Sequence, residues 1–217
     1  MGRPIRAAVL GEGPVRLYIL GGIHGDERGG VDTTPLLLDH LLEGIPSVFT
    51  VRFVLDANPD GTIAATRENH NGIDLNRNFP TEDFVGGPVH GAEPLSEPES
   101  IALADDVESF EPDVILALHS AWTGPFINYD GPGRELAEAF HAAAAELDDR
   151  WTVVADLEWG TPGSLGTYWG VERGIPVLTT EPSRYDSAAE TWPAIRAGVD
   201  AVISMLVWQN SMLGGAR

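Results

Sequence analysis

The residues best suited to chemistry lie directly after an apolar run near the start of the chain. The stretch LYILGGIHGDERGG, residues 17–30, passes from apolar positions into two glycines and then places His24, Asp26 and Glu27 close together. Cysteine is absent, which excludes disulfides, thiolate metal sites and cysteine nucleophiles. A metal would therefore need histidine or carboxylate ligands, and the His-x-x-Glu spacing could bring His24 and Glu27 to one cation.

Two further apolar runs also end on side chains that could do chemistry. DVILALHS (113–120) delivers His119, and IPVLTTE (175–181) delivers Glu181. In open α/β sheets ligands bind beyond the carboxyl ends of the strands, so we expect these side chains to meet at one edge of a sheet. Two histidines and a glutamate are a frequent zinc set in hydrolases, and a carboxylate that does not bind the metal can act as general base. Spacing alone leaves open that the histidines are simply buried at strand ends.

The elements that must position these residues follow from the hydrophobic pattern. Apolar runs bounded by Gly, Pro or Asp predict strands, and the stretches of helical periodicity between them predict helices. The predicted strands cover residues 15–20, 48–55, 113–120, 151–157 and 175–181, and the predicted helices cover residues 32–42, 96–110, 133–149 and 189–209. Strands that alternate with helices favour an α/β sandwich around a largely parallel sheet. No linker divides residues 1–217, so we expect a single catalytic domain.

Two local features refine this prediction. Ser96 is predicted to be the N-cap of its helix, with Pro98 in the first turn and Glu99 as the capping-box partner. Residues 58–94 form a polar stretch rich in Gly, Asn and Pro. A loop of that length in a compact domain is usually functional or mobile.

The charge of the chain narrows the classes of partner. There are 33 acidic residues against 13 basic ones, all of them arginine, and the formal net charge is −20. This balance disfavours nucleic-acid binding. A membrane span needs roughly 18–20 unbroken apolar residues, which no window provides, and a secretory signal is missing from the N-terminus. We therefore expect a cytoplasmic protein without a nucleic-acid or membrane partner; salt or acid adaptation and a GC-rich genome explain its charge equally well.

The motifs taken together resemble a known family. NPDGTIAATRENHNGIDLNRNFP (58–80), the earlier His-x-x-Glu, the distal LHS and the late glutamate follow the order of the zinc carboxypeptidase (funnelin) family. Within that family the chain most resembles the bacterial murein peptide amidases. The stretches that carry this closer resemblance are GRPI (2–5), GGIHGDE (21–27), GIDLNRNFP (72–80), EPLSEPES (93–100), TPGSLGTYW (161–169) and TTEP (179–182).

The resemblance implies a fold and a metal site. The fold is a three-layer α/β/α sandwich around a mixed, largely parallel sheet. One zinc ion is implied on His24, Glu27 and His119, and zinc lowers the pKa of its water toward about 7. Glu181 is implied as the general base that deprotonates this water and passes the proton to the leaving amine.

The resemblance also implies how substrate is held. Arg67 matches the arginine that polarises the scissile carbonyl and stabilises the oxyanion, and Asn76 and Arg77 match the pair that grips a free carboxylate. A planar guanidinium pairs bidentately with a carboxylate, and a fixed cation beside a carbonyl favours the tetrahedral intermediate. The implied partner is a small peptide with a free carboxylate.

One segment departs from the larger digestive-type carboxypeptidases. Those enzymes carry a substrate-capping tyrosine before a glycine-serine turn, but DLEWGTPGS (156–164) contains no tyrosine. Trp159 or Tyr168 are the residues that could partly substitute for it. The specificity pocket is expected to be shaped by the three residues Leu165, Gly166 and Thr167.

Three functions compete on these observations. The first is a zinc metallopeptidase or amidase that cleaves an amide next to a free carboxylate, with γ-D-glutamyl-meso-diaminopimelate in murein peptides as the expected bond. The second is an N-acyl amino acid deacylase of the aspartoacylase or succinylglutamate desuccinylase type, or a general metallocarboxypeptidase. The third is a binding module without turnover, which Glu181 argues against because a binder has no use for a positioned base. Intact NPDG and DLNRNFP favour the first.

Overall fold

The protein folds around one seven-stranded sheet. The computed structural model describes residues 2–155 and 161–214. The elements follow one another as β1 (Ala7–Leu10), β2 (Val15–Gly21), α1 (Arg28–Glu43), β3 (Phe49–Val54), α2 (Pro59–Ala64), η1 (Leu75–Arg77), α3 (Pro98–Phe110), β4 (Val114–Leu118), β5 (Phe126–Asp130), α4 (Arg134–Ala145), β6 (Thr152–Val154), η2 (Gly166–Val171), β7 (Val177–Glu181) and α5 (Ala188–Gly214).

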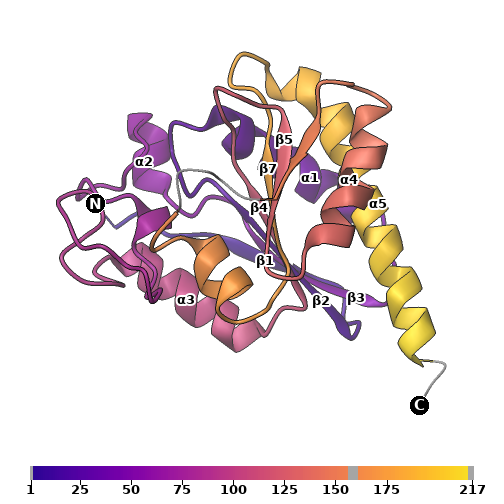
Figure 1. The fold of residues 1–217 in the computed structure, drawn as a ribbon, viewed down its shortest axis with the longest axis horizontal. Coiled ribbons are helices and arrows are strands. Elements are labelled where there is room, and N and C mark those ends of the chain that lie inside the picture. Colours follow the sequence, from indigo (N-terminus) through magenta and orange to yellow (C-terminus); the bar gives the residue numbers. More distant parts are fainter. Residues whose placement is uncertain (1, 156–160, 215–217) are drawn as a thin grey trace.

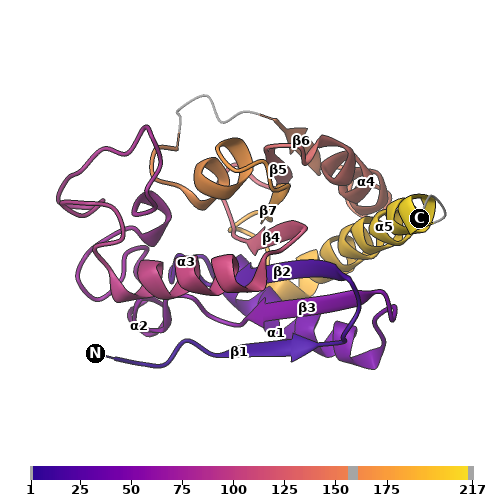
Figure 2. The same cartoon turned by 90° about the horizontal axis from the view of Figure 1, so that it is seen from below.

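The sheet is mixed and largely parallel, as predicted. Its strand order is β1-β3-β2-β4-β7-β5-β6, and Figure 2 shows the strands following one another in this order from bottom to top. β1 pairs antiparallel with β3 and β5 pairs antiparallel with β7, while the remaining neighbours are parallel. The central strands β2, β4 and β7 therefore point their carboxyl ends the same way. Side chains that follow them must meet at one edge of the sheet.

Helices cover both faces of this sheet, which confirms the three-layer sandwich. One apolar core joins Leu17 and Ile19 of β2 to side chains of α1, α4 and α5. The other joins Tyr18 and Leu20 to α3 and η2. Alternate residues of β2 are thus buried on opposite faces, which explains why residues 17–20 form a continuous apolar run. Figure 1 shows α4 and α5 together on the right and α2 and α3 on the left.

The structure corrects two details of the sequence prediction. Ser96 does not cap α3: the helix begins at Pro98 with Glu97 at the N-cap position, and the Ser96 hydroxyl instead accepts a hydrogen bond from Asn78 at 3.0 Å. The long polar stretch of residues 58–94 contains the short helix α2 and the 3₁₀ turn η1. None of the helices within the described ranges combines the length and apolar character needed to cross a membrane.

Candidate active site

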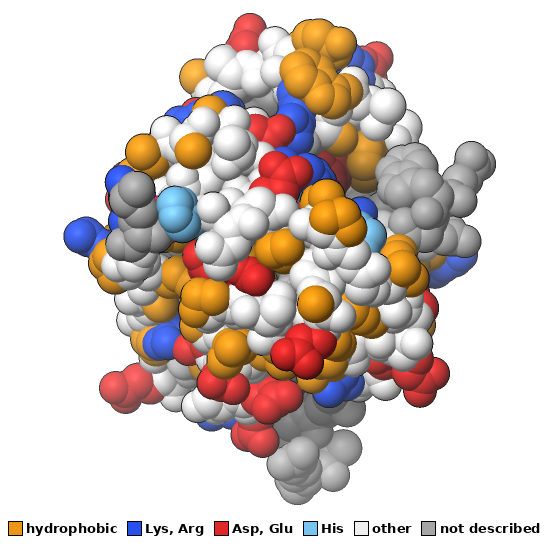
Figure 3. Space-filling model, turned by 90° about the vertical axis from the view of Figure 1, so that its left-hand side faces the viewer, with side chains coloured by type: hydrophobic (Ala, Val, Ile, Leu, Met, Phe, Trp, Pro, Cys, Tyr) orange, Lys and Arg blue, Asp and Glu red, His pale blue; other side chains and the backbone are white. Residues whose placement is uncertain are grey.

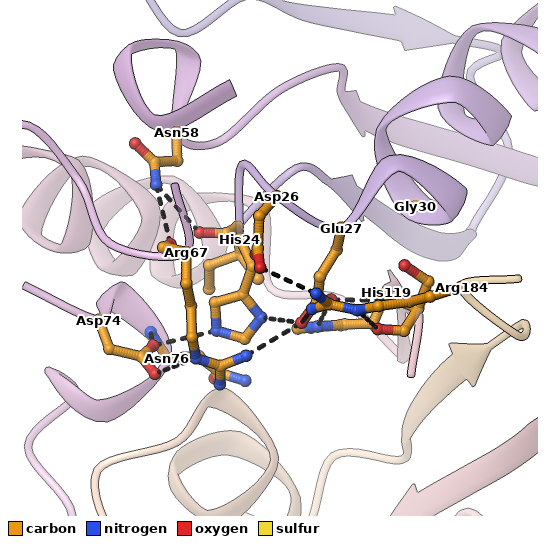
Figure 4. Close-up of polar contacts among 12 residues, drawn as sticks. His24, Asp26, Glu27, Gly30, Asn58, Arg67, Asp74, Asn76, His119 and Arg184 are labelled. Carbon is orange, nitrogen blue, oxygen red and sulfur yellow. Dashed lines mark hydrogen bonds and ion pairs between the residues drawn. The ribbon is translucent and has the colours of Figure 1, made fainter. Parts of the chain in front are cut away.

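Three side chains that could bind a metal converge beyond the carboxyl ends of β2 and β4. His24 follows β2, Glu27 directly precedes α1, and His119 follows β4. The Nδ1 atoms of His24 and His119 each lie 2.8 Å from a different carboxylate oxygen of Glu27, and the three ligand atoms lie within 4.8 Å of one another. All three residues are buried, and Figure 4 shows them pointing toward one another. Two imidazoles and one carboxylate match the donor set of zinc sites in hydrolases, so the group fits zinc.

Close packing of α1 on the end of β4 brings Glu27 to His119. Gly30 lies in the first turn of α1, and a methyl group at this position would collide with the carbonyl of Leu118 and the Cα atom of His119. The helix can approach the strand this closely only without a side chain there. The glycines after Arg28 in the sequence therefore have a steric role in placing Glu27.

Asp74 and Arg67 hold the metal-binding group from one side. Asp74 Oδ1 lies 3.0 Å from His24 Nε2, and Asp74 Oδ2 accepts a hydrogen bond of 2.8 Å from Arg67 Nε. Arg67 also donates to Glu27 Oε1 at 3.0 Å. The contact with Asp74 favours a proton on Nε2 of His24, which leaves Nδ1 available to a metal. Arg67 is thus beside the metal-binding group, where the resemblance requires it.

The same contacts fix the ionisation of the two carboxyl groups. Burial acts to raise the pKa of Glu27, but the charges and hydrogen bonds of His24 and His119 outweigh it and hold this pKa well below its usual value. Burial likewise opposes ionisation of Asp74, and the hydrogen bond from His24 and the charges of His24 and Arg67 lower its pKa instead. Both groups are therefore carboxylates at neutral pH, as a metal ligand and the partner of a ligand histidine should be.

Glu181, the residue predicted to be the general base, is a buried carboxyl group with a raised pKa. It ends β7 and lines the same pocket as the metal-binding group. Burial, and then the negative charge of Glu27, raise the pKa of Glu181 to about 8. A carboxyl group in this range can accept and release a proton near neutral pH, and a cation beside it would lower its pKa.

Arg184 belongs to the site, although no motif in the sequence points to it. Its guanidinium donates to Glu27 Oε1 at 3.0 Å, to Asp26 Oδ2 at 2.8 Å and to the carbonyl of Ser120 at 2.9 Å. In Figure 4, Arg184 and Arg67 approach Glu27 from opposite sides. The partner of Asp26 in the structure is therefore Arg184, which also contacts Glu27.

Asn76 and Arg77 are held by the turn η1. The carboxylate of Asp74 accepts the backbone N–H of Asn76 at 2.9 Å, which starts the turn. The side-chain oxygen of Asn76 accepts the backbone N–H of Leu165 at 2.8 Å, and Arg77 donates to the carbonyl of Asn76 at 2.6 Å. Both side chains line the pocket, where a guanidinium can pair with a carboxylate.

All seven residues selected from the sequence line one cavity of about 250 Å³. They are His24, Glu27, Arg67, Asn76, Arg77, His119 and Glu181. Figure 3 looks onto the left-hand side of the view in Figure 1 and shows acidic and basic side chains next to one another in the upper part of this face. The structure therefore brings the residues together, while their individual roles stay predictions.

Of the three residues expected to shape the specificity pocket, one is among the described residues that line the cavity. Gly166 lines the pocket, but Leu165 is buried in the core and Thr167 is not among the described residues that line it. Tyr168 is also buried and stacks on Phe79, so it cannot serve as the capping aromatic residue. The other candidate for that role, Trp159, lies outside the described residues.

Comparison with known proteins places this fold and site in a family. A family model described as zinc carboxypeptidase matches residues 1–190. The chain belongs to the zinc carboxypeptidase family and is a zinc hydrolase of the peptidase class.

Individual relatives share both sequence and fold with the chain. It is 31% identical over 192 residues to murein peptide amidase A of Escherichia coli K12, covering 80% of this chain and 74% of that protein. It is 30% identical over 183 residues to murein peptide amidase A of Vibrio campbellii, and the match covers 76% of this chain and 68% of that protein. The crystal structure of murein-tripeptide amidase MpaA from E. coli O157 superposes with a TM-score of 0.68 at 26% identity. The match covers 88% of this chain and 84% of that chain. Bovine thrombin-activatable fibrinolysis inhibitor shares the fold alone, with a TM-score of 0.78 at 19% identity. The match covers 95% of this chain and 86% of that chain.

Proposed function

We propose that the protein is a cytoplasmic zinc amidase that hydrolyses the γ-D-glutamyl-meso-diaminopimelate bond of murein peptides. The observation that carries this proposal is the convergence, in one cavity, of the group His24, Glu27 and His119 with Glu181 and the arginine-lined wall. A metal site alone would suit many hydrolases. Its combination with a base and with guanidinium groups for a carboxylate suits cleavage of an amide beside a free carboxylate.

His24, Glu27 and His119 would hold one zinc ion, with the pocket side left open. Zinc bound there supplies Lewis-acid activation of water and of the scissile carbonyl. Glu181, which lines the same cavity, accepts the proton of the attacking water and delivers it to the leaving amine. Arg67, fixed between Asp74 and Glu27, faces the developing oxyanion.

Asn76 and Arg77 supply the contacts for the free carboxylate of the substrate. Because η1 is tied to Leu165 across the pocket, these two side chains are positioned before substrate binds. The choice of a murein peptide rests on the similarity to murein peptide amidases in sequence and structure. An N-acyl amino acid deacylase and a general metallocarboxypeptidase remain the alternatives, since both could use the same metal, base and carboxylate contacts.

The test is hydrolysis of L-Ala-γ-D-Glu-meso-diaminopimelate by the zinc-loaded protein, alongside N-acyl amino acids and C-terminal peptides. We expect release of diaminopimelate and a loss of at least about 100-fold in kcat for Glu181→Gln. Glu12→Gln, which removes an exposed carboxylate that is not among the described residues lining the cavity, should retain full activity. Turnover of another member of the panel in place of the tripeptide would keep the zinc mechanism and overturn the murein substrate.

A further inference from the structure

The C-terminal half of α5 is apolar on two sides. Val202, Ile203 and Leu206 face inward and are buried in the core that also contains side chains of α1 and α4. Trp208 and Met212 lie on the outward side and are 61% and 63% exposed. A surface helix of a globular protein usually carries polar residues on its outer side, and a helix that is apolar around most of its circumference is usually buried. The outward side of α5 therefore has the composition of an interface.

The outward apolar residues are spaced as in a coiled coil. Four of them, which are four, three and four residues apart, form one row along the helix. They are Ala201, Met205, Trp208 and Met212, and we call them the outer stripe. The first two are half-buried and the last two are exposed. A row with this spacing is the seam along which one helix packs against another.

The same part of α5 carries no charged side chain. Its last charged residue is Asp200, and residues 201–214 contain neither an acidic nor a basic residue, although 21% of the chain is charged. Apart from the outer stripe, the exposed side chains among residues 201–212 are those of Ser204 and Ser211, which are neutral as well. This half of the helix therefore offers no group to a partner that is recognised through ion pairs.

A second copy of the chain suits such a surface. The net charge of −20 makes two copies repel each other wherever their acidic surfaces meet. Contact along the uncharged half of α5 buries apolar surface without placing charges of the two helices side by side. In Figure 1 the yellow C-terminal turns of α5 extend past α4 toward the lower right, so this half of the helix lies at the periphery of the molecule.

The order of large and small residues in the outer stripe suits an antiparallel pair. Pairing about the point midway between Met205 and Trp208 puts Met205 opposite Trp208 of the second copy, and the small Ala201 opposite the long Met212. Antiparallel helices also place their dipoles in the favourable relative direction and keep the two acidic bodies toward opposite ends of the pair. Because both copies use the same surface, the contact is two-fold and closes at two chains.

We propose that the outer stripe holds two copies of this chain together as an antiparallel, two-fold dimer. The contact is small, since its largest member is one tryptophan from each copy and a tryptophan side chain buries roughly 150–250 Å². We therefore expect a dissociation constant of about 1–100 µM, as in weak or transient interfaces. The outer stripe is not among the described residues that line the cavity, so the inference is independent of the proposed function.

Sedimentation equilibrium of the full chain over a wide range of concentration tests the proposal. We expect the mass to rise from the 23.2 kDa of one chain toward twice that value as the concentration passes the dissociation constant. Trp208→Glu places a carboxylate in the seam and should raise the dissociation constant at least 100-fold. Ile63→Glu adds the same charge at a 66% exposed residue of α2 and should leave the dimer intact. A monomer at every concentration, or an assembly that grows beyond two chains, would overturn the proposal.

The salt dependence distinguishes this interface from one made of ion pairs. Screening weakens the repulsion between the two acidic chains, so the dimer should be at least about threefold tighter in 1 M than in 0.1 M sodium chloride. Weaker association in 1 M salt would place the contact on charged residues elsewhere and contradict the role of the outer stripe.

The absence of cysteine from the chain allows the direction of pairing to be measured. Single cysteines at Ala201→Cys and Met212→Cys should be joined by a short bismaleimide when the two variants are mixed. Met212→Cys alone should not cross-link, because the two copies of residue 212 lie roughly 16 Å apart along an antiparallel pair at about 1.5 Å per residue. Efficient cross-linking of Met212→Cys alone would refute the antiparallel arrangement.

Discussion

The guanidinium of Arg184 donates to Glu27 Oε1 at 3.0 Å, although the two residues are 157 positions apart in the chain. The same arginine also binds Asp26, so a single cation balances two neighbouring carboxylates. Arg184 is nearly buried, with 12% of its side chain exposed, and Glu27 is 6% exposed. The carboxylate of Glu27 is therefore compensated by protein charge from both sides, by Arg67 and by Arg184.

Replacing Arg184 by alanine should destabilise the metal-free protein more than the zinc-loaded protein. Removing one partner of a buried ion pair typically costs about 3–5 kcal/mol, and zinc would replace part of the lost positive charge. Urea unfolding with and without a chelator measures the free energy of unfolding of the metal-free and of the zinc-loaded protein. Arg196→Ala removes an exposed arginine from α5 and should change the free energy of unfolding by less than about 0.5 kcal/mol. Equal losses in both metal states would argue against charge compensation at Glu27.

His119→Ala should abolish zinc binding. The substitution leaves two of the three clustered donors, too few for a stable zinc site. At a free zinc concentration 100 times the Kd, the unaltered protein should gain about 2.7 kcal/mol of stability, and His119→Ala should gain none. Metal analysis of the dialysed protein measures zinc binding, and thermal unfolding with added zinc measures the gain in stability. His70→Ala, at an exposed position, is the control and should bind zinc normally. Zinc retained at full stoichiometry in His119→Ala would refute the assignment of His119 as a ligand.

Gly163→Ala should both destabilise the protein and weaken substrate binding. Gly163 has φ of +71°, and a methyl group there would collide with the backbone carbonyl of Arg77. The left-handed conformation costs an alanine about 1–2 kcal/mol, and the collision adds to this and displaces Arg77. Gly174→Ala has nearly the same φ, +72°, with open space around it, and isolates the backbone cost. Urea unfolding and KM for the tripeptide should separate the variants, with KM raised only for Gly163→Ala.

Tyr18 should make the protein lose stability at alkaline pH. Burial, and then the charge and hydrogen bond of Asp106, raise the pKa of Tyr18 far above its usual value of 10. Above pH 10 the unfolded chain releases this proton and the folded chain keeps it, so the contribution is complete below pH 10 and declines by about 1.4 kcal/mol per pH unit above it. Tyr18→Phe should lack this decline.

Unfolding by urea between pH 8 and 11 is the measurement. At pH 8 the phenylalanine variant should be less stable by about 1 kcal/mol, since the hydroxyl of Tyr18 donates to Asp106 at 2.9 Å. The chain contains no lysine, so tyrosines dominate titration in this range. Tyr185→Phe, at an exposed tyrosine, should show the full decline. Parallel curves for Tyr18→Phe and the unaltered protein would contradict the prediction.

The metal-binding group and its sheet edge could be predicted because each residue follows a recognisable apolar strand. β2, β4 and β7 are central strands; β2 and β4 are almost fully buried and mostly apolar, and β7 begins with the apolar pair Val177 and Leu178. The motif order then identified the family. Local spacing and family resemblance were sufficient to select seven of the residues that line the cavity.

The remaining features have no comparable signal in the sequence. β5 was missed because its inward side chains include Asn128 and Asp130, which face a polar pocket and break the apolar pattern. β1 was missed because it is a short, half-exposed strand at the edge of the sheet. Arg184 follows β7 with no distinctive spacing, and its partners lie near the other end of the chain. Long-range ion pairs of this kind become visible only in the folded protein.

The strand order has a consequence for synthesis of the chain. β7 lies between β4 and β5, although both precede it in the sequence. While the ribosome is still making the segment before Val177, the two halves of the sheet have no strand to join them, and neither Glu181 nor Arg184 exists. The nascent chain thus carries His24 and Glu27 from an early stage, before other residues that line the cavity have been made. The cavity can be complete only after translation has passed Arg184.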